Sequence, residues 1–389
     1  MERRDFKKVL LIGISYVLVA ALASAITLAL WGGRYSKMEE LKGVIDKNFI
    51  GQADMTKAED AAASAMIDAL GDRWSYYISA EEYAAHMENK NNAYVGIGIT
   101  IIVREDGKGE DIIAVSPGSS AQEAGILPGD VLIKVNGTSI AGMDTDRVGD
   151  LVKGEEGTSL TVTVLREGAE KDFNLKRQTI RVQVARGKLL DGNIGLVRIE
   201  NFNTNCAKET IAVIEDLQKQ GADKLIFDVR YNPGGYVHEM IKLLDYLLPE
   251  GVLYRDLDCY GNKGEERSDA ACLELPMAVL VNGSSYSAAE FFAACLQEKS
   301  WATVVGEQTT GKGHYQNTIR LSDGSAVNLS TGKYFTPNGV NLTEAGGLTP
   351  DVRSTVDEET AMQIYSQVID AVEDPQIQAA VKYLQENKG

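Results

Sequence analysis

The chain has 389 residues and a formal net charge of −17 at pH 7. This length is sufficient for two or three domains, each with its own hydrophobic core. A large excess of negative charge repels phosphate backbones, so the composition argues against a nucleic-acid-binding protein.

The N-terminal sequence predicts the cellular compartment in which the domains lie. Residues 9–31 carry no charge and are long enough to cross ~30 Å of hydrocarbon as one helix. Basic residues precede them, so the positive-inside rule keeps the N-terminus in the cytoplasm and exports the remainder. We therefore expect a cytoplasmic stub and transmembrane anchor over residues 1–34. The alternative is secretion after signal cleavage, because residues 21–25 contain small-x-small cleavage patterns.

A small helical module is expected at residues 35–90. Met38, Leu41 and Val44 recur at the spacing of one helix face, and residues 61–70 continue the pattern.

From residue 91 the pattern changes to short strands and turns. Residues 94–100, 112–121, 125–137 and 158–166 resemble, in this order, the segments of a PDZ domain of the bacterial protease type. We place this domain at residues 91–170. A PDZ domain binds a chain end by adding it as a strand, while backbone amides hold the terminal carboxylate.

The candidate carboxylate-binding loop consists of Gly96, Ile97, Gly98 and Ile99. Small residues allow the carboxylate to approach, and the isoleucines are expected to line an apolar pocket. In isolation the same tetrapeptide would indicate a bulged strand. A helix beside the peptide groove is expected over residues 144–153.

After residue 181 strands and helices alternate, which is typical of an α/β fold. Strands are expected at residues 194–199, 224–229 and 277–281, and helices at residues 206–220 and 236–248. We place this core at residues 171–355. A C-terminal helical segment is expected at residues 356–389, with residues 358–388 helical.

The sequence leaves open whether two of the four cysteines form a disulfide. Cys259 and Cys272 flank a turn signal at residues 261–264, and an exported compartment permits a disulfide across the resulting hairpin. Cys206 and Cys295 are expected to be buried thiols. The chain has three histidines and neither a Cys-x-x-Cys nor a His-Glu-x-x-His pattern, so no metal site is expected.

The strongest chemical signal is a serine followed by a lysine. Residues 277–281 lead through small residues into a helix expected to begin near Ser287, which puts a hydroxyl where backbone N–H groups converge. Lys312 stands between two glycines, and a buried, neutral lysine can act as the base for a serine nucleophile. In isolation, Ser287 with Glu290 would indicate only a capping box, and Gly-Lys-Gly a surface turn.

The spacings resemble those of the carboxy-terminal processing peptidases, also called tail-specific proteases. Glu290 follows Ser287 by three residues, Lys312 follows Ser287 by 25, and Gln316 is four beyond the lysine. Two further segments are similar to the family's Asp-Pro-Tyr-Ser-x-Tyr segment and Arg-x-Asn-Pro-Gly-Gly turn, namely residues 71–77 and 228–235. The similarity extends from about residue 38 to residue 352.

The resemblance assigns the site residues. It implies Ser287 as nucleophile, Lys312 as base and Gln316 as the residue that orients the lysine. Spacing alone does not separate Ser287 from Ser284 or Ser285, and the resemblance makes that choice.

The resemblance also implies a sheet-and-helix core of the crotonase/Clp-protease type, with the PDZ domain inserted. In such a core a glycine amide of Gly234 or Gly235 and the amide of Ala288 would form the oxyanion hole. The sequence does not indicate which glycine donates.

We therefore expect a membrane-anchored serine endopeptidase that recognises substrate C-termini through its PDZ domain and needs no cofactor. Its expected partners are proteins or peptides with free apolar C-termini, the membrane, and a second copy in a homodimer. A non-catalytic PDZ-bearing binding or scaffold protein on the same fold is the alternative. A crotonase-like acyl-CoA enzyme would have no use for a PDZ domain or an export segment.

Overall fold

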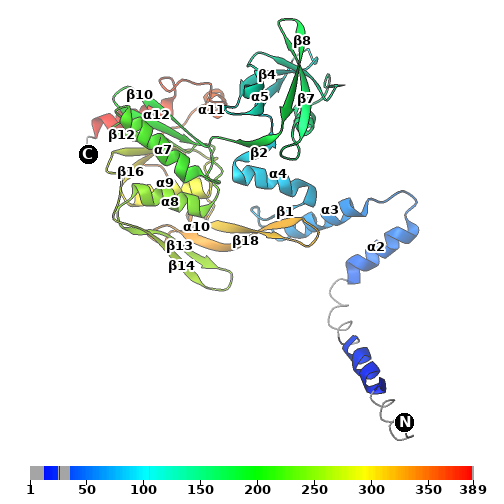
Figure 1. Cartoon of the computed structure of the whole chain (residues 1–389). Coiled ribbons are helices and arrows are strands. Elements are labelled where there is room, and N and C mark those ends of the chain that lie inside the picture. The colour runs from blue at the N-terminus through cyan, green and yellow to red at the C-terminus, as the bar shows by residue number, and fades with distance from the viewer. Residues whose placement is uncertain (1–12, 25, 27–35, 105, 388–389) are drawn as a thin grey trace, which may run out of the picture. The chain divides into compact units, whose positions relative to one another are not determined.

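The computed structural model describes residues 13–24, 26, 36–104 and 106–387 (Figure 1). These residues form two compact units, one ending at Gly71 and the other beginning at Asp72. The expected transmembrane stretch at residues 9–31 lies partly outside the described residues. Residues 13–24 are helical, and no described helix is both long and apolar enough to cross a membrane.

The first unit contains helices α2 (Ser36–Asn48) and α3 (Met55–Asp68), which confirm the helical periodicity. The Asp54 side chain caps α3 by accepting a hydrogen bond from the Lys57 amide at 3.2 Å. Strand β1 (Tyr76–Ile78) and helix α4 (Ala80–Asn91), which the sequence analysis assigned to the same module, belong to the second unit.

The PDZ-like region is a sheet in the order β3-β4-β5-β7-β8, with β6 beside β5. Its elements are β3 (Ile99–Val103), β4 (Glu110–Val115), α5 (Ser120–Ala124), β5 (Val131–Val135), β6 (Thr138–Ser139), α6 (Thr145–Val152), β7 (Ser159–Arg166) and β8 (Ala169–Lys176). It has a hydrophobic core of its own, centred on residues such as Ile97, Ile112 and Leu132. The helix expected beside the groove is confirmed as α6.

Strands β2 (Ala93–Gly96) and β9 (Gln178–Arg181) pair antiparallel at the two ends of this region. The chain therefore enters and leaves the PDZ-like region at one place, as an inserted domain requires.

The peptidase-like core contains a sheet in the order β10-β11-β12-β15-β16-β19. Its strands are β10 (Ala185–Leu190), β11 (Ile194–Ile199), β12 (Lys224–Asp228), β15 (Met277–Val281), β16 (Ala302–Gly306) and β19 (Val352–Arg353). Strands β11 to β19 run parallel, and β10 is antiparallel to β11. The α/β expectation is confirmed.

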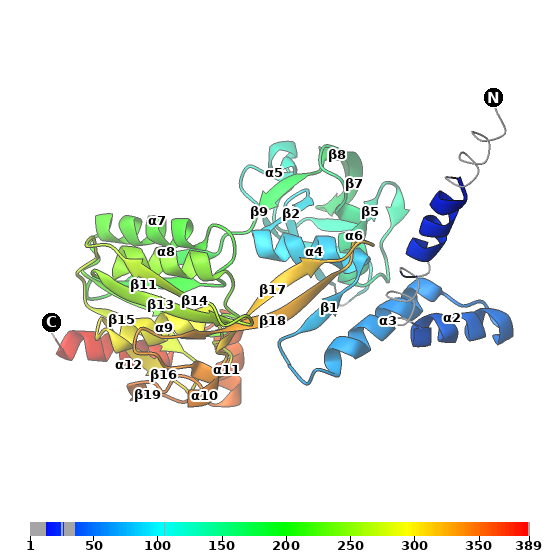
Figure 2. The same cartoon turned by 90° about the horizontal axis from the view of Figure 1, so that it is seen from below.

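Helices cover both faces of this sheet. They are α7 (Cys206–Lys219), α8 (Val237–Leu247), α9 (Ala288–Glu298) and α12 (Pro375–Glu386). Because strand side chains alternate between faces, Leu225 and Phe227 of β12 pack in a core with α7, α8 and α9, while Ile226 packs against α12. Figure 2 shows α7 and α8 on one side of the sheet and α12 on the other.

A second sheet has the order β1-β18-β13-β14, with β17 also paired to β18. Its remaining elements are β13 (Gly251–Asp258), β14 (Lys263–Ser268), β17 (His314–Arg320) and β18 (Ala326–Phe335), and the short helix α10 (Leu342–Ala345) follows. The β17–β18 hairpin extends toward β1, with which β18 pairs (Figure 2). The segment after Asp72 is thereby joined to the hairpin that follows the Gly-Lys-Gly motif.

The hairpin expected near Gly261 is present as β13–β14, but it carries no disulfide. Cys259 lies in its turn, Cys272 lies beyond β14, and both are free thiols. Cys206 and Cys295 are buried as expected, and burial raises the pKa of each thiol to about 12.

The C-terminal segment, expected to be helical over residues 358–388, is helical in two pieces. The segment forms α11 (Glu358–Tyr365) and α12, separated by residues 366–374. Pro375 is the first residue of α12, where the missing N–H costs nothing, whereas within a longer helix it would break the hydrogen-bond ladder.

Candidate active site

Ser287 lies where strand β15 turns into helix α9. It is the N-cap of α9 with φ 59° and ψ −124°, which is a strained conformation for a residue with a side chain. Ser285 holds the turn, because its hydroxyl donates to the Val229 carbonyl at 2.7 Å and accepts from the Asn282 amide at 3.0 Å. Ser285 is fully buried, which leaves Ser287 as the serine of the turn that faces a cavity.

The Glu290 carboxylate connects the serine turn to the lysine segment. Its Oε2 accepts from the amides of Ser287 at 3.3 Å and Lys312 at 2.9 Å. Its Oε1 accepts from the Gly311 amide at 2.7 Å and the Thr309 hydroxyl at 2.5 Å. Burial raises the pKa of Glu290, whereas these four donors favour the ionised form. One buried side chain thus fixes the relative positions of both proposed reactive segments.

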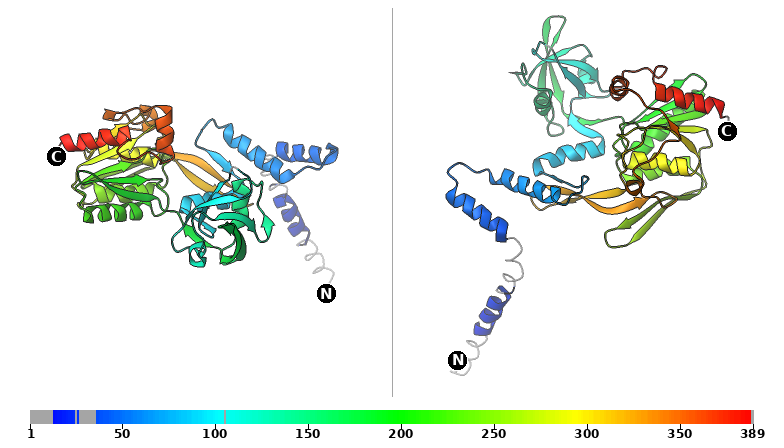
Figure 3. Two further views of the ribbon diagram at one scale, coloured as in Figure 1. Left: turned by 90° about the horizontal axis from the view of Figure 1, so that it is seen from above. Right: turned by 180° about the vertical axis from the view of Figure 1, so that it is seen from behind.

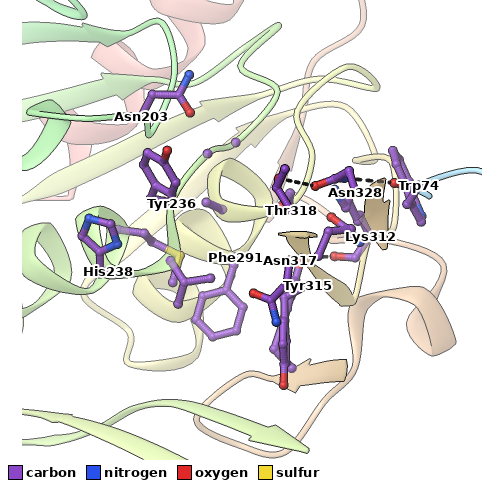
Figure 4. A pocket seen from close by; sticks show the side chains of 18 of the residues that line it. Trp74, Asn203, Tyr236, His238, Phe291, Lys312, Tyr315, Asn317, Thr318 and Asn328 are labelled. Atoms are coloured by element: carbon purple, nitrogen blue, oxygen red, sulfur yellow. Dashed lines mark hydrogen bonds between the residues drawn. The ribbon is translucent and has the colours of Figure 1, made fainter. Parts of the chain in front are cut away.

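Two aromatic rings flank the Lys312 amine, and Figure 4 shows one of them, Trp74, beside the lysine. Lys312 is only 9% exposed, and its Nζ lies 4.6 Å from the ring centroid of Trp74 and 5.8 Å from that of Tyr286. The two rings stack at 5.5 Å. Burial, assisted by the nearby charge of Lys90, lowers the pKa of Lys312 to about 8. A useful fraction of the amine is therefore neutral near pH 7–8, as a base requires.

Tyr334 holds the backbone at Lys312. Its buried hydroxyl donates a hydrogen bond to the Lys312 carbonyl, and it also interacts with the Ser287 side chain. Burial raises the pKa of Tyr334 well above its ordinary value, so the phenol stays neutral and acts as a hydrogen-bonding group rather than a base.

Gln316 lines the same cavity, but its side-chain hydrogen bonds are to residues other than Lys312. Its amide nitrogen donates to the His314 carbonyl at 3.1 Å and to the Ser330 hydroxyl at 3.0 Å. The Ser330 amide in turn donates to Ser75, whose hydroxyl donates to Asp72 at 2.6 Å. Asp72 is the nearby negative charge that most raises the pKa of Lys312. Gln316 thus belongs to a polar network at the edge of the lysine pocket.

The glycine turn lies directly against the nucleophile. A Cβ on Gly234 would stand 2.8 Å from both the Ala288 amide nitrogen and the Ser287 Cβ, and its φ of +84° also requires glycine. The Gly234 amide donates to the Asn232 side chain at 2.8 Å. The Ala288 amide is the first of α9 and has no acceptor within the helix.

One cavity of about 850 Å³ brings the expected site residues together. It is lined by Gly234, Gly235, Ser287, Ala288, Lys312 and Gln316. Its walls include Met240 and the aromatic side chains of Phe291 and Tyr315, the last two labelled in Figure 4. Sequence reasoning assigned no role to Trp74, Lys90 or Tyr334, because no spacing pattern connects residues so far apart in the chain.

The expected peptide-binding loop connects β2 to β3. Ile97 is completely buried in the PDZ core, Ile99 is half-buried, and Gly98 has φ +80°. A Cβ on Gly98 would meet the Ser119 Cβ at 2.3 Å. Strand β3 is at the edge of its sheet and contacts α6, an arrangement that suits the addition of a peptide strand.

Comparison with known proteins identifies the family. Residues 193–354 match peptidase family S41 and residues 112–166 match a PDZ domain. The chain is 33% identical over 358 residues to the carboxy-terminal processing protease CtpA of Bacillus subtilis, covering 87% of this chain and 76% of that protein. The chain belongs to peptidase family S41. The resemblance stated from the motifs is thereby confirmed, as is the presence of a PDZ domain.

Other S41 proteins are also similar. A probable CtpA-like serine protease of Staphylococcus epidermidis is 33% identical over 322 residues, covering 81% of this chain but 64% of that protein. The crystal structure of a putative S41 protease from Bacteroides fragilis superposes with a TM-score of 0.53 at 17% identity, covering 83% of this chain and 90% of that one. This likeness shows the shared S41 fold.

Proposed function

We propose that this S41 protein is a membrane-anchored serine endopeptidase that binds free, apolar C-termini through its PDZ domain and hydrolyses peptide bonds by a Ser/Lys mechanism. The observation that carries the proposal is the buried Lys312, whose backbone amide shares the Glu290 carboxylate with the Ser287 amide. Such a lysine, with a pKa near 8, is suited to accept a proton from a serine held on the same support.

In this mechanism the Ser287 hydroxyl attacks the scissile carbonyl while neutral Lys312 takes its proton. The lysine then protonates the leaving amine, and a water molecule hydrolyses the acyl-enzyme after losing its own proton to Lys312. The Ala288 amide and the Gly235 amide would stabilise the tetrahedral oxyanion. Gly235 is favoured over Gly234, because the Gly234 amide already donates to Asn232.

Gln316 would act indirectly. Its bonds to the His314 carbonyl and Ser330 hydroxyl support the strand pair β17–β18, which follows the Gly-Lys-Gly motif. We assign it the role of holding this wall of the lysine pocket.

The uncharged stretch at residues 9–31, preceded by basic residues, supports a single membrane anchor with the peptidase and PDZ domains on the extracytoplasmic side. Secretion after signal cleavage is the alternative. Fractionation of cells expressing the full chain distinguishes the two, because an anchored protein stays with the membrane after washing at high salt and high pH.

The test is cleavage by the purified full-length chain. We expect it to cut an unstructured protein that ends in apolar residues, with fragments identified by mass spectrometry, and the Ser287→Ala variant to produce none. Binding of the substrate without cleavage by the wild-type chain would instead support a non-catalytic PDZ-bearing protein.

A further inference from the structure

A buried ion cluster is centred on Arg230, at the start of the turn that contains Gly234 and Gly235. The Arg230 guanidinium, only 3% exposed, donates to Asp228 through Nε at 2.8 Å and through Nη2 at 2.7 Å. On its other side Nη1 donates to Asp374 Oδ1 at 3.1 Å and to Gln376 Oε1 at 2.9 Å, and Nη2 forms an ion pair with Asp374 Oδ2 at 2.8 Å. Each nitrogen of this guanidinium therefore has a partner in the cluster.

Two of these partners come from the C-terminal segment. Asp374 is the N-cap of α12, and its Oδ1 also accepts from the amides of Gln376 at 2.9 Å and Ile377 at 3.2 Å. The same carboxylate thus starts the helix that covers one face of the sheet and holds Arg230 in place. Figure 3 shows α11 and α12 against the peptidase core.

Arg230 begins the turn that contains the proposed oxyanion-hole glycine. The next residue, Tyr231, has φ 60°, and its amide donates to the Asn282 side chain at 3.0 Å. Asn232 then accepts from the Gly234 amide at 2.8 Å and donates to the Ile199 carbonyl at 2.7 Å. A displacement of Arg230 would therefore move a short, hydrogen-bonded turn that leads to the glycines beside the nucleophile.

Helix α11 contacts the same turn independently. The Tyr231 hydroxyl donates to the Ala361 carbonyl at 3.0 Å, and its ring packs edge-on against Tyr365 with centroids 5.2 Å apart. Both helices of the C-terminal segment therefore hold residues 230–231 in place.

We propose that Asp374 is a positioning residue for the oxyanion hole, holding Arg230 so that the turn from Tyr231 to Gly235 directs an amide at the carbonyl attacked by Ser287. The inference rests on the proposed peptidase function. It gives the C-terminal segment a role in the chemistry in addition to covering the sheet, because oxyanion stabilisation requires donors fixed before the reaction.

The test is Asp374→Asn in the full chain. Asparagine caps helices as well as aspartate, so α12 keeps its start, but the charge facing Arg230 is lost. We expect kcat to fall about 10- to 100-fold, because a misplaced oxyanion donor costs stabilisation made only in the transition state, while KM stays within about twofold. Affinity for a peptide boronate, which presents a tetrahedral oxyanion, should fall by a similar factor.

The matched control is Leu384→Ala, also on α12. Leu384 is 2% exposed and packs against the sheet, and its aliphatic side chain can form no hydrogen bond or ion pair with the cluster. It should lower the melting temperature at least as much as Asp374→Asn, yet the folded fraction should keep nearly wild-type kcat and boronate affinity. An Asp374→Asn enzyme whose kcat per folded molecule is unchanged would overturn the proposal.

Should Asp374→Asn fail to fold, Gln376→Met provides a second test. It removes one acceptor of Arg230 and keeps the length of the side chain, so a smaller fall in kcat with unchanged KM is expected, and unchanged kcat would overturn the proposal. Failure of the proposed peptidase function would be distinguishable from failure of this inference, because without that function the wild-type chain itself would not cleave.

Discussion

Lys312 Nζ lies 4.6 Å from the centroid of the Trp74 ring. The ring excludes water, which lowers the pKa of the lysine, while its π face attracts the ammonium form and acts in the opposite direction. The pKa is about 8 rather than 10.5. A difference of that size corresponds to about 3 kcal/mol, which exceeds the roughly 0.5–2 kcal/mol of a cation–π contact. Exclusion of water therefore dominates at this site.

Two substitutions of Trp74 should separate these effects. Trp74→Ala admits water, so the pKa of Lys312 should rise and the acidic limb of kcat/KM should move to higher pH by about one unit. Trp74→Leu keeps an apolar cover but removes the π face, so the limb should move slightly to lower pH. The pH dependence of kcat/KM measures both. Shifts in the same direction would contradict this account of the ring.

The wild-type profile should reflect the lysine. Because neutral Lys312 is the base and its pKa is about 8, kcat/KM should rise with pH through that value. Lys312→Arg should be inactive, since a guanidinium stays protonated. The control is His314→Ala, because His314 begins β17 two residues after the lysine. Loss of the acidic limb in His314→Ala would indicate that the histidine is the base.

The lowered pKa of Lys312 also predicts that the free energy of unfolding depends on pH. In the unfolded chain Lys312 titrates near 10.5 and in the folded chain near 8, so between these values the unfolded state binds more protons and stability rises with pH. Below pH 8 both states are protonated and the folded state bears the whole cost of the buried charge. Lys312→Met should therefore raise the free energy of unfolding at pH 7 by about 1–3 kcal/mol while abolishing cleavage. Urea denaturation at pH 7 and pH 10 measures this, and the gain should shrink at pH 10.

The local parts of the site were predictable from the sequence. The apolar residues 277–281, the small-residue turn and the helix after Ser287 are adjacent in the chain, so their pattern predicts β15 and α9. The lysine pocket was not predictable, because Trp74 reaches it only through the pairing of β1 with β18. The ion pair between Arg230 and Asp374 depends likewise on how α12 packs. The C-terminal break at Pro375 had a local signal, since proline starts helices more readily than it continues them.

Tyr334→Phe should impair catalysis, although it removes only a hydroxyl group and leaves the shape of the side chain almost unchanged. It leaves the buried Lys312 carbonyl without the tyrosine donor, and an unsatisfied buried carbonyl costs about 1–3 kcal/mol. We expect kcat/KM to fall about tenfold as the lysine segment shifts. Tyr254→Phe is the matched control, because Tyr254 is also buried beside Phe291 and its hydroxyl has no hydrogen bond among the described residues. Equal losses in the two variants would contradict a specific role for the Tyr334 hydroxyl.

Cleavage should depend on the free C-terminus of the substrate. A PDZ loop between β2 and β3 would bind the terminal carboxylate with backbone amides, and amidation removes that negative charge. We expect a peptide acid with an apolar C-terminus to be cleaved about 10-fold or more faster than its amide at low concentration, since charge-assisted hydrogen bonds are worth about 1.5–3 kcal/mol.

Substitution of the loop supplies the matching protein variant. Gly98→Ala puts a Cβ 2.3 Å from the Ser119 Cβ at a positive φ, so the loop must move, whereas Gly118→Ala bears similar backbone strain at φ +70° with open space around it. Gly98→Ala should therefore abolish the difference between acid and amide substrates, and Gly118→Ala should preserve it. A small serine-directed reagent needs only Ser287 and its base, so it should react with both variants at the same rate. Equal cleavage of acid and amide by the wild-type chain would mean that this protease does not recognise chain ends through the loop.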